Sequence, residues 1–153
     1  MRPGIVILFL LLLTSCGKPD HASDEKAILE FLKREQQAHL EKNVDLLFAN
    51  GLSGITVVSQ GTVSNPTDEE TRKRFNSYFE SVNFIKWEDT ADPIIRFSDD
   101  ASLAYTIIQK QVILTLKEDV TAKPDTTDFA WISIWRKANG KWKMESMAST
   151  KKP

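Results

Sequence analysis

The feature of this sequence that most constrains its fold is the period of its apolar residues, which is helical in the first half and alternating in the second. Residues 24–42 carry apolar side chains at helical spacing, with Ser23 as the expected N-cap. A shorter helix is expected at 44–48. A third should follow Thr67, whose hydroxyl fits a capping box with the carboxylate of Glu70.

The second half of the chain predicts a sheet. Asn139-Gly140 is a strong signal for a tight hairpin turn, because both positions tolerate positive φ, and the polar stretch 117–128 is expected to be a long loop. Helices that precede a run of antiparallel strands predict an α+β fold, with the helices on one side of a strongly curved antiparallel or mixed sheet. Strands are expected at 55–59, 84–89, 93–97, 103–116, 129–137 and 141–148.

The N-terminus has the layout of a secretory signal. Arg2 precedes the apolar run Ile5–Leu13, which is too short to span a bilayer, and small residues follow it. The stretch Leu13-Thr14-Ser15-Cys16 resembles the bacterial lipobox, in which the cysteine becomes the lipidated first residue of the mature protein. The alternatives are a plain signal peptide, or a buried N-terminal helix in which Cys16 is incidental.

The lipobox resemblance implies a lipoprotein signal peptide at 1–15, a polar tether at 16–23 that starts from lipidated Cys16, and a folded domain at 24–150. Each methylene of an acyl chain such as palmitate contributes about 0.8 kcal/mol to membrane binding, so two or more chains attach a protein stably. Gly17, where an aspartate would imply the inner membrane, implies the outer membrane of the cell envelope, with the domain in the periplasm. The membrane is therefore an expected partner.

Composition narrows the remaining partners. The chain has 153 residues, 41% of them apolar, which suits one domain with a real core. Its net charge of −1 gives no global positive field for nucleic acid, so no nucleic-acid partner is expected. A single cysteine excludes an internal disulfide and a multi-cysteine metal site. No metal and no cofactor is expected.

The C-terminal stretch FAWISIWRKANGKWKMESMAST, residues 129–150, joins a Trp-containing strand to a Lys-Trp strand through an Asn-Gly turn. This stretch and the order of elements resemble the NTF2-like superfamily in its SnoaL-like branch. Residues 43–47 resemble the family's turn between the first two helices, with Asn43 where a Gly-Asp pair is more usual. The resemblance covers residues 24–149. It implies a cone whose cavity binds apolar ligands or holds the acids and bases of isomerases, dehydratases or hydrolases.

Glu35 and His39 are the candidate catalytic residues. They lie four residues apart on the extension of the apolar stripe of the first helix, close enough to form a hydrogen bond. In a partly dry pocket the carboxylate is expected to raise the pKa of His39 and to fix its tautomer, as a general base requires. Alternatively, the two side chains form an ordinary pair at the wet rim. The helix tyrosine and strand acids of isomerase-type relatives do not transfer, since the first helix has no Tyr and the nearest acids are Glu88 and Glu145.

Aromatic residues are the candidate pocket lining. Alternation places Phe129, Trp131, Ser133 and Trp135 on one face of their strand and the isoleucines on the other. The pocket residues expected are Phe31, Trp87, Trp131, Ser133 and Trp135. The alternative assigns most of these aromatics to the core and the opposite face to a homodimer, since NTF2-like domains commonly pair sheet to sheet.

Three functions follow from these candidates. The first is a lipid-anchored, non-catalytic domain that binds a small apolar or amphipathic ligand in the cone. The second is a dimeric adaptor whose cavity is filled by its own aromatic residues. The third, the least favoured, is an enzyme that uses Glu35 and His39 on a small periplasmic substrate.

Overall fold

The computed structural model describes residues 21–118, 121 and 123–153. The predicted signal peptide at 1–15 and the predicted lipidation site, Cys16, lie outside the described residues. Within the described ranges, no helix combines the length and the apolar character needed to cross a bilayer.

Three helices form where the first half of the sequence has helical periodicity. They are α1 (Ala22–Leu40), α2 (Val44–Ala49) and α3 (Asp68–Ser81). The capping box at the start of α3 is confirmed, since Thr67 and Glu70 each bond the other's backbone N–H. The start expected for α1 is wrong: the helix begins at Ala22 with His21 as N-cap, so Ser23 lies inside it.

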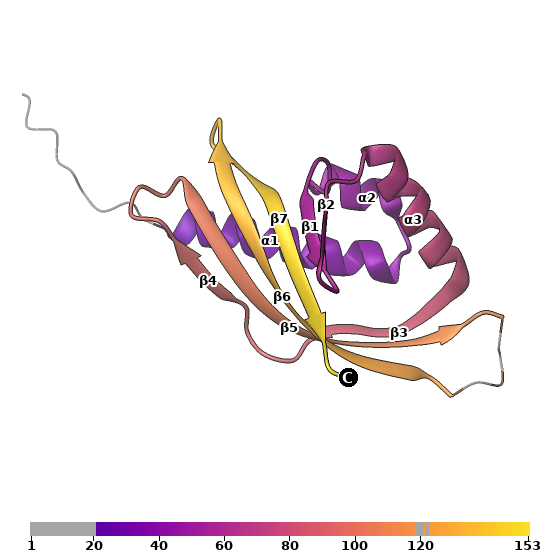
Figure 1. Cartoon of the computed structure of the whole chain (residues 1–153). Helices are drawn as coiled ribbons and strands as arrows, with labels where there is room; N and C mark the ends of the chain where they lie inside the picture. Colours follow the sequence, from indigo (N-terminus) through magenta and orange to yellow (C-terminus); the bar gives the residue numbers. More distant parts are fainter. Residues whose placement is uncertain (1–20, 119–120, 122) are drawn as a thin grey trace, which may run out of the picture.

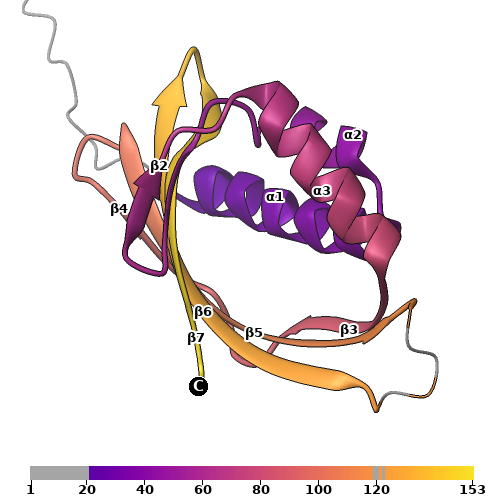
Figure 2. The same ribbon diagram turned by 45° about the vertical axis from the view of Figure 1, so that its right-hand side comes forward.

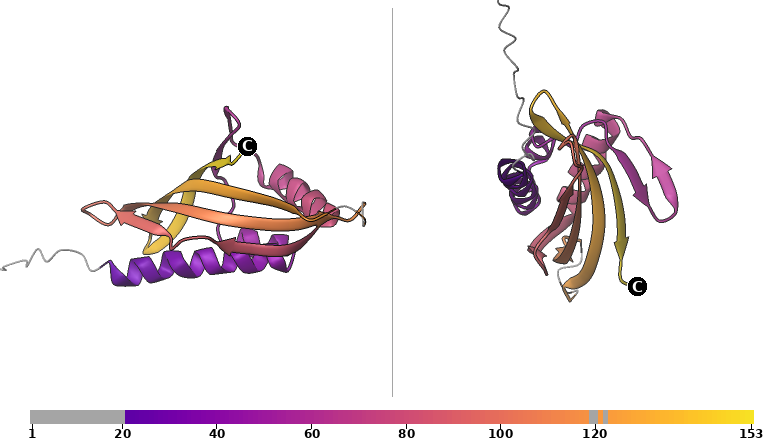
Figure 3. Two further views of the ribbon diagram at one scale, coloured as in Figure 1. Left: turned by 90° about the horizontal axis from the view of Figure 1, so that it is seen from below. Right: turned by 90° about the vertical axis from the view of Figure 1, so that its left-hand side faces the viewer.

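A seven-stranded mixed sheet covers one side of the helices, as the α+β prediction required (Figures 1 and 2). The strands are β1 (Thr56–Ser59), β2 (Thr62–Ser64), β3 (Val82–Asp89), β4 (Ile94–Phe97), β5 (Leu103–Leu116), β6 (Asp125–Ala138) and β7 (Lys141–Lys151). Their order in the sheet is β2-β1-β7-β6-β5-β3, with β4 also paired to β5, and among the described strands only β1 and β7 run parallel. Figure 3 shows α1 running along one face of the bent sheet.

The strand boundaries correct several expectations. β2 was not predicted, and β7 extends to Lys151, three residues beyond the predicted end of its strand at 148. The long loop expected at 117–128 is shorter, because residues 125–128 pair with β5 as the first part of β6. Polar residues at the tip of this long hairpin form a regular strand because their backbones pair with β5, which outweighs the low β-propensity of their side chains.

A β-bulge in β7 changes which of its side chains face the helices. Trp135 pairs with Met144, but the preceding Ile134 pairs with Ser146, so Glu145 is an extra residue. Simple alternation would have put Ser146 and Ala148 on the same face as Met144. The bulge instead turns Met147 and Ser149 inward, where they line the candidate site.

The core has two parts. One lies between α1 and the sheet, where Phe31 packs edge-on against fully buried Trp135, with ring centroids 4.5 Å apart. The other lies between the end of α1, α2 and α3, around Ala38, Leu47 and Phe79. The site lies between these two cores.

Candidate functional site

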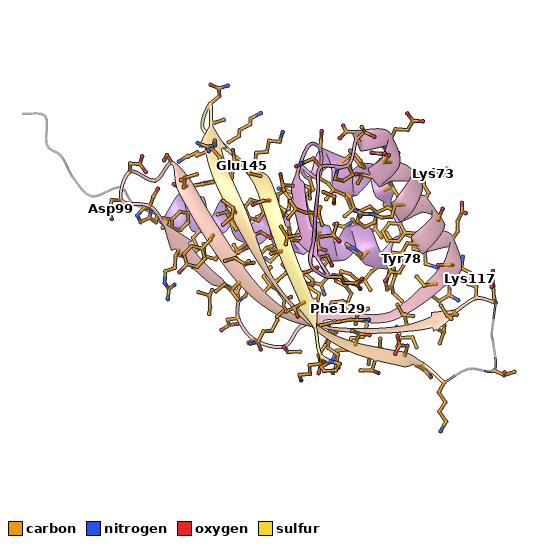
Figure 4. The ribbon with its side chains drawn as sticks, viewed as in Figure 1. Lys73, Tyr78, Asp99, Lys117, Phe129 and Glu145 are labelled. Carbon is orange, nitrogen blue, oxygen red and sulfur yellow. The ribbon has the colours of Figure 1, made fainter. Side chains whose placement is uncertain are left out.

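A pocket of about 230 Å³ lies between the helices and the concave face of the sheet. Its lining is mostly apolar. Tyr78 of α3 and Phe129 of β6, both labelled in Figure 4, contribute from the helical and the sheet side. The other lining residues are Phe31, Leu32, Glu35 and His39 of α1, Leu47, Asn50, Leu52 and Phe75 from the α2 and α3 regions, and Trp87, Trp131, Met144, Met147 and Ser149 of the sheet.

Glu35 and His39 form the polar corner of this pocket. His39 Nδ1 lies 2.8 Å from the backbone carbonyl oxygen of Glu35 and 3.1 Å from its carboxylate Oε1. Because a carbonyl oxygen can only accept, Nδ1 must carry a proton and donate it. In the neutral ring the lone pair is then on Nε2. The two residues expected to act together are thus in contact, at the inner wall rather than at a wet rim.

The rings around His39 come from two other elements, α3 and β3. Its ring stacks on Trp87 of β3, with centroids 3.7 Å apart and planes 13° from parallel. The rings of Phe79 and Phe84 approach it edge-on. Only 5% of the residue is exposed.

This burial lowers the pKa of His39, and the attraction of Glu35 only partly offsets the effect. Glu35 acts on the pKa of His39 in the expected direction, but the expected outcome, a raised pKa, is wrong because burial outweighs it. The reason is that a desolvated imidazolium costs more than one adjacent, partly solvated carboxylate returns. The imidazole is neutral at neutral pH.

Lys110 is a charged residue beside the site that the sequence reasoning missed. It lies on the inner face of β5, 3% exposed, with its Nζ 2.5 Å from Asp89 Oδ1. The ammonium is 6.0 Å from the ring centroid of Trp87 and 5.9 Å from that of Trp131. Strand alternation could have found it, because Lys110 falls in phase with Ile108 and Val112 of the buried face.

The predicted pocket residues separate into two groups. Phe31, Trp87 and Trp131 line the pocket. Ser133 and Trp135 do not, because both are fully buried in the core beneath it. The alternation that selected them gave the face correctly but not the depth along the strand.

The strand acids considered as catalytic candidates lie elsewhere. Glu145, at the bulge, pairs with Arg136 in solvent, and Glu88 pairs with Lys86 at 3.5 Å. Over residues 21–118, 121 and 123–153, no three His, Cys, Asp or Glu side chains group closely enough to hold a metal ion.

Solved structures resemble this chain closely in fold. An NTF2-like superfamily protein from Salmonella enterica serovar Typhimurium superposes with a TM-score of 0.68 at 12% identity, over 86% of this chain and 92% of its own. The chain has the NTF2-like fold. An NTF2-like protein from Cytophaga hutchinsonii gives 0.64 at 16% identity, over 82% and 96% of the two chains.

A candidate dehydratase of the NTF2-like family from Streptomyces avermitilis gives a TM-score of 0.67 at 10% identity, over 85% of this chain and 96% of its own. At such identities the likeness concerns the fold alone. No family model matches the sequence, and no curated protein matches it.

Proposed function

We propose that this NTF2-like domain binds a small apolar or amphipathic molecule in its cone and is held at a bacterial envelope membrane by lipid on Cys16. The observation that supports binding is the pocket of about 230 Å³, with aromatic walls and one polar corner. Its volume is just below the usual range for ligand pockets, about 300–1,000 Å³, so the ligand is small. An open pocket also favours this function over an adaptor with a filled interior.

The anchoring part of the proposal rests on the sequence around Cys16. Four residues lie between Cys16 and α1's N-cap, His21, and the five steps from one to the other span at most about 18 Å when fully extended. Lipidation there would keep the start of α1 near the bilayer. Gly17 favours the outer membrane.

Native mass spectrometry of the full chain, released from detergent micelles, tests both parts. We expect a mass that corresponds to loss of residues 1–15 with acyl chains on Cys16, and a bound molecule that departs on activation. A polypeptide with residues 1–15 attached and Cys16 unmodified would contradict the anchor. Clean protein that also fails to take up any small apolar compound would contradict the binding function.

An enzymatic function is the second candidate, and the contact between Glu35 and His39 favours it. A neutral imidazole with Nδ1 protonated presents Nε2 as a base to a substrate in the pocket, and Glu35 would stabilise the imidazolium that forms. Isomerase, dehydratase and hydrolase reactions all need such a proton transfer. Glu35→Gln would keep ligand binding but abolish activity in cells if the protein is an enzyme; full retained activity would remove this candidate.

Pairing of two copies is proposed for the outer face of the sheet. An apolar row crosses it through the register partners Ile94, Ile107, Ile132 and Ala148. The three isoleucines are 36–45% exposed in the single chain. Large exposed apolar patches of this kind mark interaction sites, and an adaptor function would use the same face.

Light scattering on the full chain in detergent tests the homodimer. We expect a dimer that Ile132→Glu converts to a monomer. The matched control is Ile85→Glu, which changes an isoleucine 58% exposed on β3, and should leave the dimer intact. A wild-type monomer at all concentrations would contradict the pairing.

A further inference from the structure

The polar corner formed by Glu35 and His39 offers a hydrogen-bond acceptor that nothing in the described part of the chain uses. His39 Nδ1 is occupied by the carbonyl oxygen of Glu35, and no described residue forms a hydrogen bond with Nε2 of this pocket-lining side chain. A ligand that covers Nε2 without donating to it would leave a desolvated acceptor without a hydrogen bond, which is unfavourable. The corner therefore selects for a donor.

The charges around the corner disfavour an anionic ligand. The Glu35 carboxylate lies in the pocket wall, 21% exposed, and the neutral His39 does not neutralise it. The nearby cation, Lys110, is already engaged by Asp89. A carboxylate ligand would thus lose its hydration and meet a like charge.

A cationic ligand is disfavoured by Lys110 for a different reason. The rings that would attract a cation are Trp87 and Trp131, and the ammonium of Lys110 is already 6.0 and 5.9 Å from their centroids. A second cation at these rings would be repelled. An uncharged ligand meets neither penalty.

The volume limits the size of the ligand. An apolar cavity of about 150 Å³ holds benzene, so by proportion this pocket of about 230 Å³ holds about nine non-hydrogen atoms. The aromatic walls favour a flat ring. A long acyl chain does not fit.

We propose that the pocket takes a small, uncharged aromatic or cyclic molecule whose hydroxyl or N–H donates a hydrogen bond to His39 Nε2. This assignment rests on the proposed ligand-binding function and names the class of ligand. Two charged groups act on His39, Glu35 on its own helix and Lys110 on β5, and Asp89 forms an ion pair with that lysine.

Three probes of matched size test the assignment by calorimetry on the full chain in lipid nanodiscs, with empty nanodiscs as the blank. They are 4-ethylphenol, 4-ethyltoluene, which replaces the hydroxyl by a methyl group, and the anion benzoate, which has the same number of non-hydrogen atoms as the other two. We expect 4-ethylphenol to bind about tenfold more tightly than 4-ethyltoluene, which corresponds to one hydrogen bond of about 1.4 kcal/mol. The benzoate should bind most weakly.

Two variants assign the selectivity to its residues. His39→Leu should abolish the preference for the phenol while retaining the hydrocarbon. Glu35→Gln should keep that preference, because the backbone carbonyl oxygen still fixes the tautomer. It should also improve binding of the benzoate several-fold.

Each outcome bears on a different part of the proposal. Equal binding of phenol and hydrocarbon to the wild-type chain would overturn the donor assignment and leave the ligand-binding function standing. Tightest binding of the benzoate would overturn the exclusion of anions. No binding of any probe would overturn the ligand-binding function itself. If His39→Leu does not fold, the three probes on the wild-type chain still test the preference for a donor, and Glu35→Gln still tests the exclusion of anions.

Discussion

Two neighbouring buried hydroxyls should respond to removal in opposite directions. Thr106 of β5 and Ser133 of β6 are register partners, and neither side chain is exposed. Thr106 Oγ1 accepts a hydrogen bond from the indole Nε1 of Trp135 at 3.1 Å. The Ser133 hydroxyl has no partner among the described residues. Beneath the pocket, the two positions differ mainly in this bond.

Thr106→Val keeps the shape of the side chain and strands the Trp135 N–H. An unsatisfied buried donor costs about 1–3 kcal/mol, and the added methyl returns about 0.8 kcal/mol. We therefore expect Thr106→Val to destabilise the fold by about 1 kcal/mol. Ser133→Ala removes a hydroxyl whose unpaired burial costs about 1–3 kcal/mol, partly offset by the small void left. We expect a gain of about 1 kcal/mol.

Urea unfolding of the full chain, followed by tryptophan fluorescence, measures both free energies, provided that the dependence on urea is the same in all proteins. The difference between the two variants should be about 2 kcal/mol, with the wild type between them. Thr106→Val as stable as the wild type, or Ser133→Ala less stable than Thr106→Val, would refute the reasoning.

Three further perturbations have defined outcomes. Asp24→Ala removes a carboxylate that accepts hydrogen bonds from Lys137 at 2.7 Å and from Trp142 at 2.9 Å. It should lower the free energy of unfolding in urea by about 2 kcal/mol. An unchanged free energy would show that this link between α1 and the β6–β7 hairpin does not stabilise the fold. Gly140→Ala places a side chain at φ +74°, with nothing within 4 Å of the new Cβ. The free energy of unfolding should therefore fall by about 1 kcal/mol from backbone strain alone, and an unchanged urea midpoint would contradict this expectation. Because burial lowers the pKa of His39 from 6.5, the unfolded chain binds more protons than the folded chain just below that pH, and the free energy of unfolding of the wild type should fall there as pH falls. His39→Leu should flatten this fall. Parallel curves of unfolding free energy against pH for the two proteins would contradict the lowered pKa of His39.

Local chemistry made parts of the fold predictable from sequence. The capping box at Thr67 forms as expected, because both of its bonds lie within one turn. Asn139 and Gly140 both adopt positive φ in the hairpin turn, at 51° and 74°. These features depend on residues close together in the chain.

The candidate site was only partly predictable, because its decisive features arise between distant segments. The spacing of Glu35 and His39 predicted their contact, but the desolvation that lowers the pKa of His39 comes from Trp87 and the phenylalanines of other elements. The bulge at Glu145 is a property of strand pairing, and the residue types there do not predict it. Lys110 was visible in the alternation of β5, yet its partner Asp89 is known only from the register of β3.

The four tryptophans allow the most direct test of the central claim, that the pocket binds a small molecule. Trp87 and Trp131 line the pocket, whereas the indoles of Trp135 and Trp142 donate to Thr106 and Asp24 outside it. In ¹H–¹⁵N spectra of the full chain titrated with 4-ethylphenol, we predict saturable shifts of the indole signals of Trp87 and Trp131, with those of Trp135 and Trp142 little changed. Shifts confined to Trp142, or no saturable shift at Trp87 and Trp131, would contradict the account.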